Sequence, residues 1–389
     1  MTVRGVLGAG EYSVTLREAW SGRVLWQTTD QTQQTVTWRR ERNATTQATV
    51  VALMRPDVAH RLEPWVHLMS VYRNDLLVWH GVVMTTRVSG TRAEITAADG
   101  SVLFSRRRVP HNRTWAQHDA TQVMRTMVED ACGYADVTGL VEAITARESR
   151  LWVTAGWTAA ECMLSDVVAH LEELGLVWCV NAGRLLIGPV AAEYTTAQVT
   201  DHHVDGQITV VKDGSEVVTD ALVVGKGVWG QYTVGSTPVG LVQSIEKADG
   251  LVRAEECEQQ AERVVRDAKV APRRVEVPSG SRLLPTAPVT IEELVPGVRV
   301  PVSTRQTGVV IGSVMQITEV EVTADASGEE VSVTFSEVNA SDVVAELPDP
   351  ADLDWRSPYE KELAASQHTG TGSGAAGVEG QDEVAVPPV

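Results

Sequence analysis

The densest group of residues that could hold a metal ion is the run Asp201-His202-His203-Val204-Asp205. Imidazole and carboxylate groups are common zinc ligands. Adjacent histidines on a strand point to opposite faces, however, so they rarely converge on one ion, and no HExxH or facial-triad spacing accompanies this run. The sequence therefore favours a solvated domain junction over a metal site.

Other patterns that could support catalysis are incomplete. The sequence has no GxSxG motif to place a serine nucleophile on a strand-to-helix turn. Gly8 and Gly10 form a short glycine pair, but no strand is predicted before them and the lysine of a phosphate-binding loop is missing. The pairs Glu172-Glu173 and Glu255-Glu256 fall on the polar faces of predicted helices, where solvation explains them better than acid–base catalysis. We predict no catalytic, cofactor-binding or metal-ligating residue, and a protein that is not an enzyme.

Cysteine is sparse and widely spaced, at Cys132, Cys162, Cys179 and Cys257. No two of these residues have the two-residue gap that metal and redox motifs use. Cys162 and Cys257 fall within helical patterns and Cys179 within a strand pattern. We therefore expect small buried hydrophobic side chains in preference to disulfides or metal ligands.

Two basic clusters interrupt an acidic background, Arg39-Arg40 with Arg42 and the run Arg106-Arg107-Arg108. Guanidinium groups could bind phosphate or a carboxylate-rich neighbouring protein. The alternative is a strand end and a linker that charge keeps soluble. The sequence leaves both interpretations open.

Tryptophan is common for a chain with two Phe residues, since there are 11 Trp. Most tryptophans in or beside apolar patterns are expected to pack in the core: these are Trp65, Trp79, Trp152, Trp157 and Trp178. Three others lie in polar or glycine-rich surroundings and are better interface candidates: these are Trp20, Trp229 and Trp355.

Composition indicates a folded, mainly β protein. The 389 residues are 43% hydrophobic and 22% charged, and this length predicts about two to three compact units. Val and Thr, which fit a pleated surface, are abundant. The net charge of -18 would be repelled by phosphate backbones, which argues against general nucleic-acid binding. No signal-peptide pattern or membrane-length apolar run is present, so we expect a soluble protein made in the cytoplasm, with no membrane insertion.

The first predicted domain, 1–106, consists of short strands. Tyr12, Val14 and Leu16 alternate with polar residues, which is typical of a half-buried strand. Two later apolar runs are joined through Asn74-Asp75, which predicts a β-hairpin. Several such strands at close spacing favour a small barrel or sandwich.

Residues 107–200 are expected to form an inserted α/β domain. Asp119 can cap a helix that Gly133 ends. Thr158 and Glu161 have the capping-box spacing for a second helix. A hairpin through Asn181-Ala182-Gly183 follows.

Strands resume in the second predicted β domain, 201–345, which one helix near 253–269 interrupts. Residues 346–389 lose periodicity and are rich in small polar residues, so we expect a flexible low-complexity C-terminal tail. The predicted fold class is thus mainly β with an α+β insert: two β-barrel-like domains and a small α/β domain.

Several short segments carry a resemblance to a known family: Leu53-Met54-Arg55-Pro56, Leu62-Glu63-Pro64-Trp65, Val71-Tyr72-Arg73-Asn74-Asp75, Trp79-His80-Gly81, Leu294-Val295-Pro296-Gly297 and Val298-Arg299-Val300. They resemble minor tail proteins of actinobacterial phages. The order of the domains resembles the baseplate hub, or tail-tip hub, proteins of long-tailed phages, and the resemblance covers roughly residues 5–345.

This resemblance implies a structural virion protein at the tail tip. The family forms homotrimers in which two β domains per subunit alternate in a pseudo-sixfold ring that continues the tail tube. The implied partners are other copies of the chain, the distal tail protein, the tape measure protein and other tail-tip proteins. DNA would only pass through the lumen, and a negative net charge suits that role because a basic lumen would retain phosphates.

Two alternatives remain. The chain could be a host-attachment β module of the same particle, in which exposed tryptophans bind a receptor or carbohydrate. A cell-wall hydrolase is the third possibility, because many family members carry a C-terminal peptidoglycan-cleaving domain. Here a short low-complexity tail occupies that position, and a hydrolase would need a carboxylate pair or metal site that the sequence does not indicate.

Overall fold

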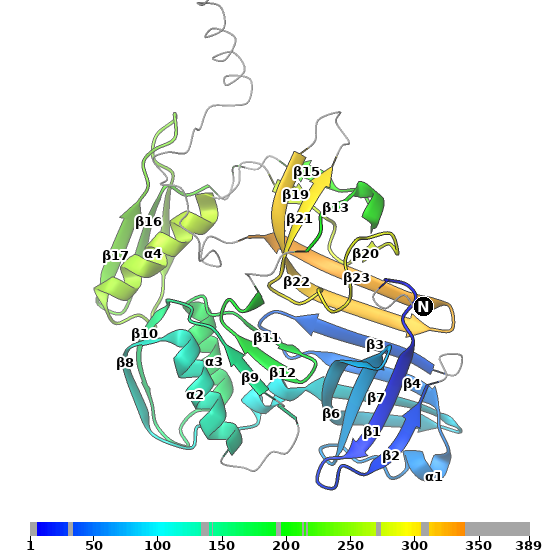
Figure 1. Ribbon diagram of the computed structural model, residues 1–389. Coiled ribbons are helices and arrows are strands. Elements are labelled where there is room, and N and C mark those ends of the chain that lie inside the picture. Colours follow the sequence, from blue (N-terminus) through cyan, green and yellow to red (C-terminus); the bar gives the residue numbers. More distant parts are fainter. Residues whose placement is uncertain are drawn as a thin grey trace, which may run out of the picture.

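The computed structural model describes residues 6–29, 34–133, 140–141, 143–191, 196–211, 214, 217–269, 274–304 and 311–338 (Figure 1). The predicted tail at 346–389 and Trp355 lie outside these residues. Most of the described elements are strands, so the mainly β prediction is confirmed. No helix in this part of the chain combines the length and apolar character needed to cross a membrane.

One large sheet of 13 strands forms the body of the molecule. Its strands run in the spatial order β14-β20-β23-β22-β3-β4-β7-β6-β5-β1-β2, and β21 branches from β22 to pair with β13. The strands are β1 (Tyr12–Glu18), β2 (Val24–Thr28), β3 (Gln34–Glu41), β4 (Gln47–Leu53), β5 (His67–Arg73), β6 (Leu76–Ser89), β7 (Arg92–Asp99), β13 (Val199–Thr200), β14 (Val204–Asp205), β20 (Ser281–Leu283), β21 (Arg299–Thr304), β22 (Ile311–Asp325) and β23 (Gly328–Glu337).

The two predicted β domains share this sheet. Strand β22 pairs with β3, so that Val322 lies opposite Trp38, and it pairs with β23 on its other side. Across the described strands the path runs open from β14 to β2. Closure of either predicted domain into a barrel is therefore not confirmed.

Turn chemistry fixes the hairpins that the sequence predicted. Asn74 and Asp75 adopt φ values of 47° and 66° between β5 and β6, as a tight hairpin turn requires. Ala182 and Gly183 adopt φ values of 50° and 79° in the second predicted hairpin. Both hairpin predictions are confirmed.

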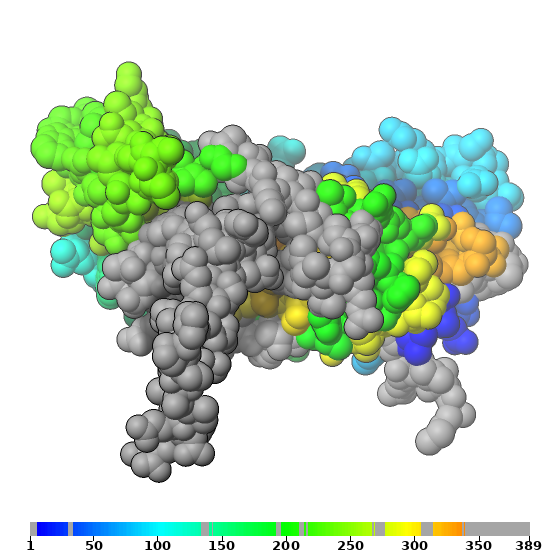
Figure 2. Space-filling view, turned by 90° about the horizontal axis from the view of Figure 1, so that it is seen from above, coloured from blue at the N-terminus to red at the C-terminus, as the bar shows by residue number. Residues whose placement is uncertain are grey.

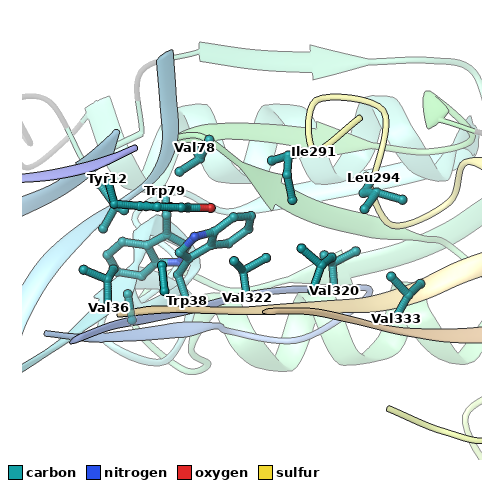
Figure 3. Packing of buried hydrophobic residues seen from close by; sticks show 14 of the residues in the cluster. Tyr12, Val36, Trp38, Val78, Trp79, Ile291, Leu294, Val320, Val322 and Val333 are labelled. Atoms are coloured by element: carbon teal, nitrogen blue, oxygen red, sulfur yellow. The ribbon is translucent and has the colours of Figure 1, made fainter. Parts of the chain in front are cut away.

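The main core lies where strands from both ends of the chain meet. Tyr12 and Trp38 come from β1 and β3, whereas Val322 and Val333 come from β22 and β23, and all four are buried in one cluster (Figure 3). Inward and outward residues alternate along β1, as the sequence pattern predicted, and along β3 as well. Hydrophobic burial thus joins segments about 300 residues apart in sequence.

Residues 107–191 contain a separate α/β layer with its own core. Helix α2 begins after Asp119, whose Oδ1 accepts a hydrogen bond from the Thr121 N–H, so the predicted cap is confirmed. The elements are β8 (Arg113–Asp119), α2 (Ala120–Gly133), β9 (Ala143–Ala146), β10 (Trp152–Trp157), α3 (Leu164–Glu173), β11 (Trp178–Asn181) and β12 (Arg184–Ile187).

The predicted cap of the next helix is wrong. Helix α3 starts at Leu164, and the carboxylate of Asp166 accepts a hydrogen bond from the Met163 N–H at 2.8 Å. Thr158 and Glu161 lie in the preceding turn. Glu161 and Asp166 lie three positions after Thr158 and Met163, and the acidic residue that bonds back to the start of the helix is the later one, Asp166.

A smaller unit, residues 217–269, is inserted into the second β region and is called the α4 unit below. Helix α4 (Ala254–Lys269) confirms the predicted helix and packs across β16 (Asp220–Val224) and β17 (Trp229–Thr233), while β18 (Gln243–Lys247) completes the sheet. In Figure 2 the unit forms a lobe at the opposite end of the molecule from β1–β7.

A two-stranded ribbon and a short helix complete the described strands and α-helices. The chain enters the α4 unit after β15 (Thr209–Val211) and returns through β19 (Arg274–Glu276), and these two strands pair with each other. A single-turn helix, α1 (Pro56–Ala59), follows β4.

Candidate functional site

A buried ion pair joins the two ends of the chain. Arg73 Nε lies 2.7 Å from Glu329 Oε1, and Arg73 Nη2 lies 2.9 Å from Glu329 Oε2. The hydroxyl of Tyr12 donates to Glu329 Oε1, the N–H of Gly8 donates to Oε2, and Arg73 Nη2 also donates to the carbonyl of Val6. Both charged side chains are fully buried. We call this group the β1–β5–β23 joint.

The electrostatics of the joint favour the ion pair. Burial lowers the pKa of the Arg73 guanidinium, but the hydrogen bond and the charge of Glu329 outweigh it and raise this pKa. Burial and then the Glu329 charge raise the pKa of Tyr12 well above its usual value, so its hydroxyl keeps its proton. A bidentate, desolvated pair of this kind holds its partners in one geometry.

The glycine pair noted in the sequence belongs to this joint. A Cβ on Gly10 would lie 2.5 Å from Arg73 Nε, so only glycine lets the backbone pass the guanidinium. Gly8 has a φ of 82° and supplies an N–H to Glu329. The pair is thus structural.

Sequence reasoning did not single out the joint, although a signal was present. Glu329 continues the inward alternation of Val331 and Val333, and Arg73 continues that of Val71. A charged residue on the buried face of a strand predicts a buried partner.

Arg40 is a second buried cation, and its partners are carbonyl groups. Its guanidinium donates to the carbonyls of Ile291, Leu294 and Val78 at 2.9–3.1 Å. It also lies 4.7 Å from the ring centroid of Trp38. Burial lowers the pKa of Arg40 to about 10. The side chain therefore ties β3 to β6 and to the segment before β21.

The other members of this basic cluster also bind within the chain. Arg39 forms ion pairs with Glu319 at 3.0 Å and Glu321 at 2.6 Å on β22. Arg42 donates to the side-chain oxygen of Gln316 at 2.8 Å. The cluster does lie at the end of β3, as the strand-end interpretation expected, but Arg40 is buried and all three side chains bind partners within the chain.

The second basic cluster lies at the surface between the large sheet and the α/β layer. Arg106 and Arg108 are exposed, and Arg107 is half-buried. The carbonyl of Arg107 accepts from the Leu164 N–H, which anchors the backbone. Neither exposed guanidinium pairs with a carboxylate among the described residues. Arg106 and Arg108 remain candidate interface residues.

The two adjacent histidines lie in a 3₁₀ turn, Asp201–His203, and not on a strand. The Nδ1 atom of His203 accepts a hydrogen bond from the Thr200 N–H at 3.2 Å. Within the described ranges, no three His, Cys, Asp or Glu side chains converge as a metal site would require.

The acidic pairs differ in their surroundings. Glu173 and Glu255 are exposed, as expected. Glu172 accepts a hydrogen bond from the indole N–H of Trp178, and burial raises the pKa of its carboxyl. Its function is thus to orient a core tryptophan.

All four cysteines have free thiols. Cys179 and Cys257 are buried, and burial raises the pKa of the Cys179 thiol to about 12. Cys162 lies in the turn before α3, so its predicted helical position is wrong.

The interface tryptophans that the structure describes are exposed, at 73% for Trp20 and 62% for Trp229. Trp79 and Trp178 are buried, as predicted, and Trp157 packs against the α/β core. Trp65 and Trp152 are 43% and 45% exposed, which contradicts the core prediction. Trp65 lies in a turn with a φ of 64°, and Trp152 starts a strand.

Comparison with solved structures shows a similar fold across most of the chain. The 43 kDa tail protein of prophage MuSo2 from Shewanella oneidensis has 13% sequence identity and a TM-score of 0.56, with 85% of this chain and 99% of that protein matched. The tail protein from Neisseria meningitidis MC58 has 11% identity and a TM-score of 0.56, with 85% and 98% matched. The fold of this chain is therefore similar to the folds of these two tail proteins. No known protein-family model matches the sequence, and comparison with curated proteins found no match.

Proposed function

We propose that the chain is a structural protein of a phage tail, and more specifically a hub subunit at the tail tip. The match of the whole fold to two phage tail proteins, each covered almost completely, carries this proposal. In this role the protein continues the tail tube, connects it to host-recognition proteins and lines the DNA exit channel. Its function is mechanical and not enzymatic.

The packing of the large sheet suits such a role. Two buried arginines, Arg40 and Arg73, link strands from opposite ends of the chain, so the sheet resists shear between its halves. No other described strand pairs with the outer edge of β2, the last strand of the sheet, and Val24 on it is exposed. An edge strand is a ready site for pairing with another chain. The proposed partners are further copies in a homotrimer, the distal tail protein and the tape measure protein.

The oligomeric state tests the proposal most directly. Light scattering on the purified chain is expected to give the mass of a trimer, and negative-stain images are expected to show a ring with a central hole. A stable monomer at high concentration, both alone and with the neighbouring tail proteins added, would contradict the hub.

An attachment module is the second candidate, because Trp20 and Trp229 are the most exposed tryptophans in the described chain. Exposed indoles stack on sugar rings and on apolar protein surfaces. Binding of host glycans that Trp20→Ala abolishes, without ring assembly, would favour this function over the hub.

A further inference from the structure

One face of the sheet in the α4 unit is left uncovered by the residues that the structure describes. Helix α4 covers the face that Ala221 and Val223 present. Residues on the opposite side of the sheet include Leu222 and Val224 of β16, and across them lie Trp229 of β17 and Ile245 of β18. We call this side the outer face. None of its apolar residues belongs to a core cluster of the described residues.

The outer face is unusually apolar for a solvated surface. Trp229 is 62% exposed and Ile245 is 72% exposed. The loop that connects β17 to β18, next to this face at its Thr233 end, contains two more exposed apolar residues, Val239 at 93% and Leu241 at 52%. Large apolar side chains that gather on one exposed surface mark a binding site more often than isolated ones do.

The packing of α4 fixes which side of the sheet is buried, so the outer face stays exposed when the unit is folded. A Cβ on Gly230 would lie 2.3 Å from the backbone nitrogen of Glu258, so the helix rests directly on β17. The sheet therefore cannot turn over to bury its outer face against α4. Only a segment other than α4 can cover the outer face.

Charge on the outer face is positive at one end. Lys247 ends β18 in the row that contains Trp229 and Val224, and Lys226 lies in the connection that follows β16 at the same end of the sheet. Neither lysine forms an ion pair with a residue in the described ranges. Most acidic residues of the unit lie on α4, on the other side of the sheet.

Among the described strand residues of the outer face, the carboxylate is that of Asp220, and it is already occupied. Asp220 accepts three hydrogen bonds at 2.6–2.8 Å, and it is 4% exposed. The donors are Gln231, Thr233 and Gln243. A segment bound to this face would thus contact apolar side chains at its centre and the amides of Gln231 and Gln243 toward one end. At the other end it would meet two lysines that form no ion pair with the described residues.

The chain itself contains a segment of the complementary type, residues 342–355. It carries five carboxylates, Asp342, Glu346, Asp349, Asp352 and Asp354, and it has no Lys or Arg. Apolar residues alternate with these acids, and the segment ends with Leu353 and Trp355. Pro348 and Pro350 favour an extended backbone, which can lie along a sheet.

The length of the chain permits this contact. The described residues end at 338, just after β23, and the β23 arrow points toward the side of the molecule that carries α4 (Figure 1). The 15 residues from 339 to 353 can span about 50 Å when extended. This reach is comparable to the diameter of a compact domain of this size.

We infer that residues 342–355 dock on the outer face of the α4 unit of the same molecule. Leu353 and Trp355 pack against Trp229 and Ile245, and the carboxylates pair with Lys226 and Lys247. The inference does not depend on the proposed tail function.

Photocrosslinking in the full chain tests the contact. A benzoylphenylalanine at position 229 is expected to crosslink to residues 342–355 of the same molecule, mapped by peptide mass spectrometry. The matched control is the same probe at the exposed Trp20 position, which should give no crosslink to this segment. Crosslinks to another region, to a second copy or to glycan in a host wall extract, or no crosslink at all, would overturn the inference.

Charge reversal distinguishes specific docking from non-specific apolar association. The K226E/K247E variant with the probe at 229 is expected to lose about tenfold in crosslink yield at low salt, as two partly exposed ion pairs predict. Adding D352K and D354K is expected to restore the yield. An unchanged yield in the double variant would contradict the charge pairing. A probe at position 245 repeats the test if the first position disturbs folding, and hydrogen exchange of α4 reports on the fold.

Discussion

The large sheet and the α4 unit are stabilised in different ways. The large sheet buries charged groups, Arg40 and the Arg73–Glu329 pair, at the contacts between its two halves. The α4 unit has a small apolar core and leaves one sheet face exposed. Buried ionic partners allow a single arrangement, whereas an open apolar face is free to receive a partner. The large sheet is therefore the rigid frame of the molecule, and the α4 unit presents a surface for binding.

The largest expected effect is on the frame. Glu329→Gln removes the negative partner of a fully buried arginine, so we expect a loss of about 3–5 kcal/mol in the free energy of unfolding. Urea denaturation followed by circular dichroism measures it.

Two further variants test whether burial of the ion pair causes this loss of stability. Glu321→Gln removes a partner of the partly exposed Arg39 and is expected to cost no more than about 1 kcal/mol. Replacing Arg73 and Glu329 together with Met should recover most of the lost stability, because no unpaired charge remains. Equal losses in the free energy of unfolding for Glu329→Gln and Glu321→Gln would contradict the view that the buried pair stabilises the large sheet more than an exposed pair does.

The next effect should be confined to the α4 unit. Gly230→Ala forces α4 away from β17 and is expected to destabilise the unit by about 1–3 kcal/mol. Hydrogen exchange should then accelerate at the amides of β16 and remain unchanged in β3 and β4. Gly133→Ala is the control, because its Cβ would enter open space. Faster exchange throughout both regions would show that they unfold as one.

A smaller effect concerns pH. Hydrogen bonds from Gln231, Thr233 and Gln243 lower the pKa of Asp220. A depressed folded-state pKa stabilises the fold above the unfolded value, about 3.9, and this contribution is lost as the pH falls through the folded value. Asp220→Asn should therefore make exchange in the α4 unit less sensitive to acid between about pH 4 and pH 2. The exposed Asp249→Asn should leave that sensitivity as it is.

The smallest effect on stability is expected at the exposed basic cluster. Changing Arg106 and Arg108 to Ala should alter the free energy of unfolding by less than about 0.5 kcal/mol, because both side chains are exposed. Oligomer formation, measured by light scattering, should nevertheless be lost. Arg55→Ala, at another exposed arginine, is the control and should assemble normally. Normal assembly of the Arg106/Arg108 variant would exclude this cluster from the interface.

Local patterns predicted the elements whose determinants are local. The two hairpin turns, the Asp119 cap and the range of α4 were readable because the deciding residues lie within a few positions of each other. The exposure of Trp20 and Trp229 also followed from their polar or glycine-rich neighbours.

Long-range contacts could not be predicted in this way. Arg40 looked like part of a surface cluster, yet its partners are carbonyls of Val78, Ile291 and Leu294, far away in sequence. The shared sheet was missed for the same reason, since the pairing of β3 with β22 has no local signature. Tertiary partners therefore decided the burial of these residues.

The pairing of β3 with β22 also sets when the protein can finish folding. Glu41 lies opposite Glu319, so ribosomes must add roughly 280 residues after β3 before its partner exists, which takes roughly 15–60 s. During that interval one edge of β3 has no native neighbour and is open to association with other nascent chains. The main sheet is therefore completed only after β22 and β23 have been made, and the rate at which a host makes this protein affects how much of it folds.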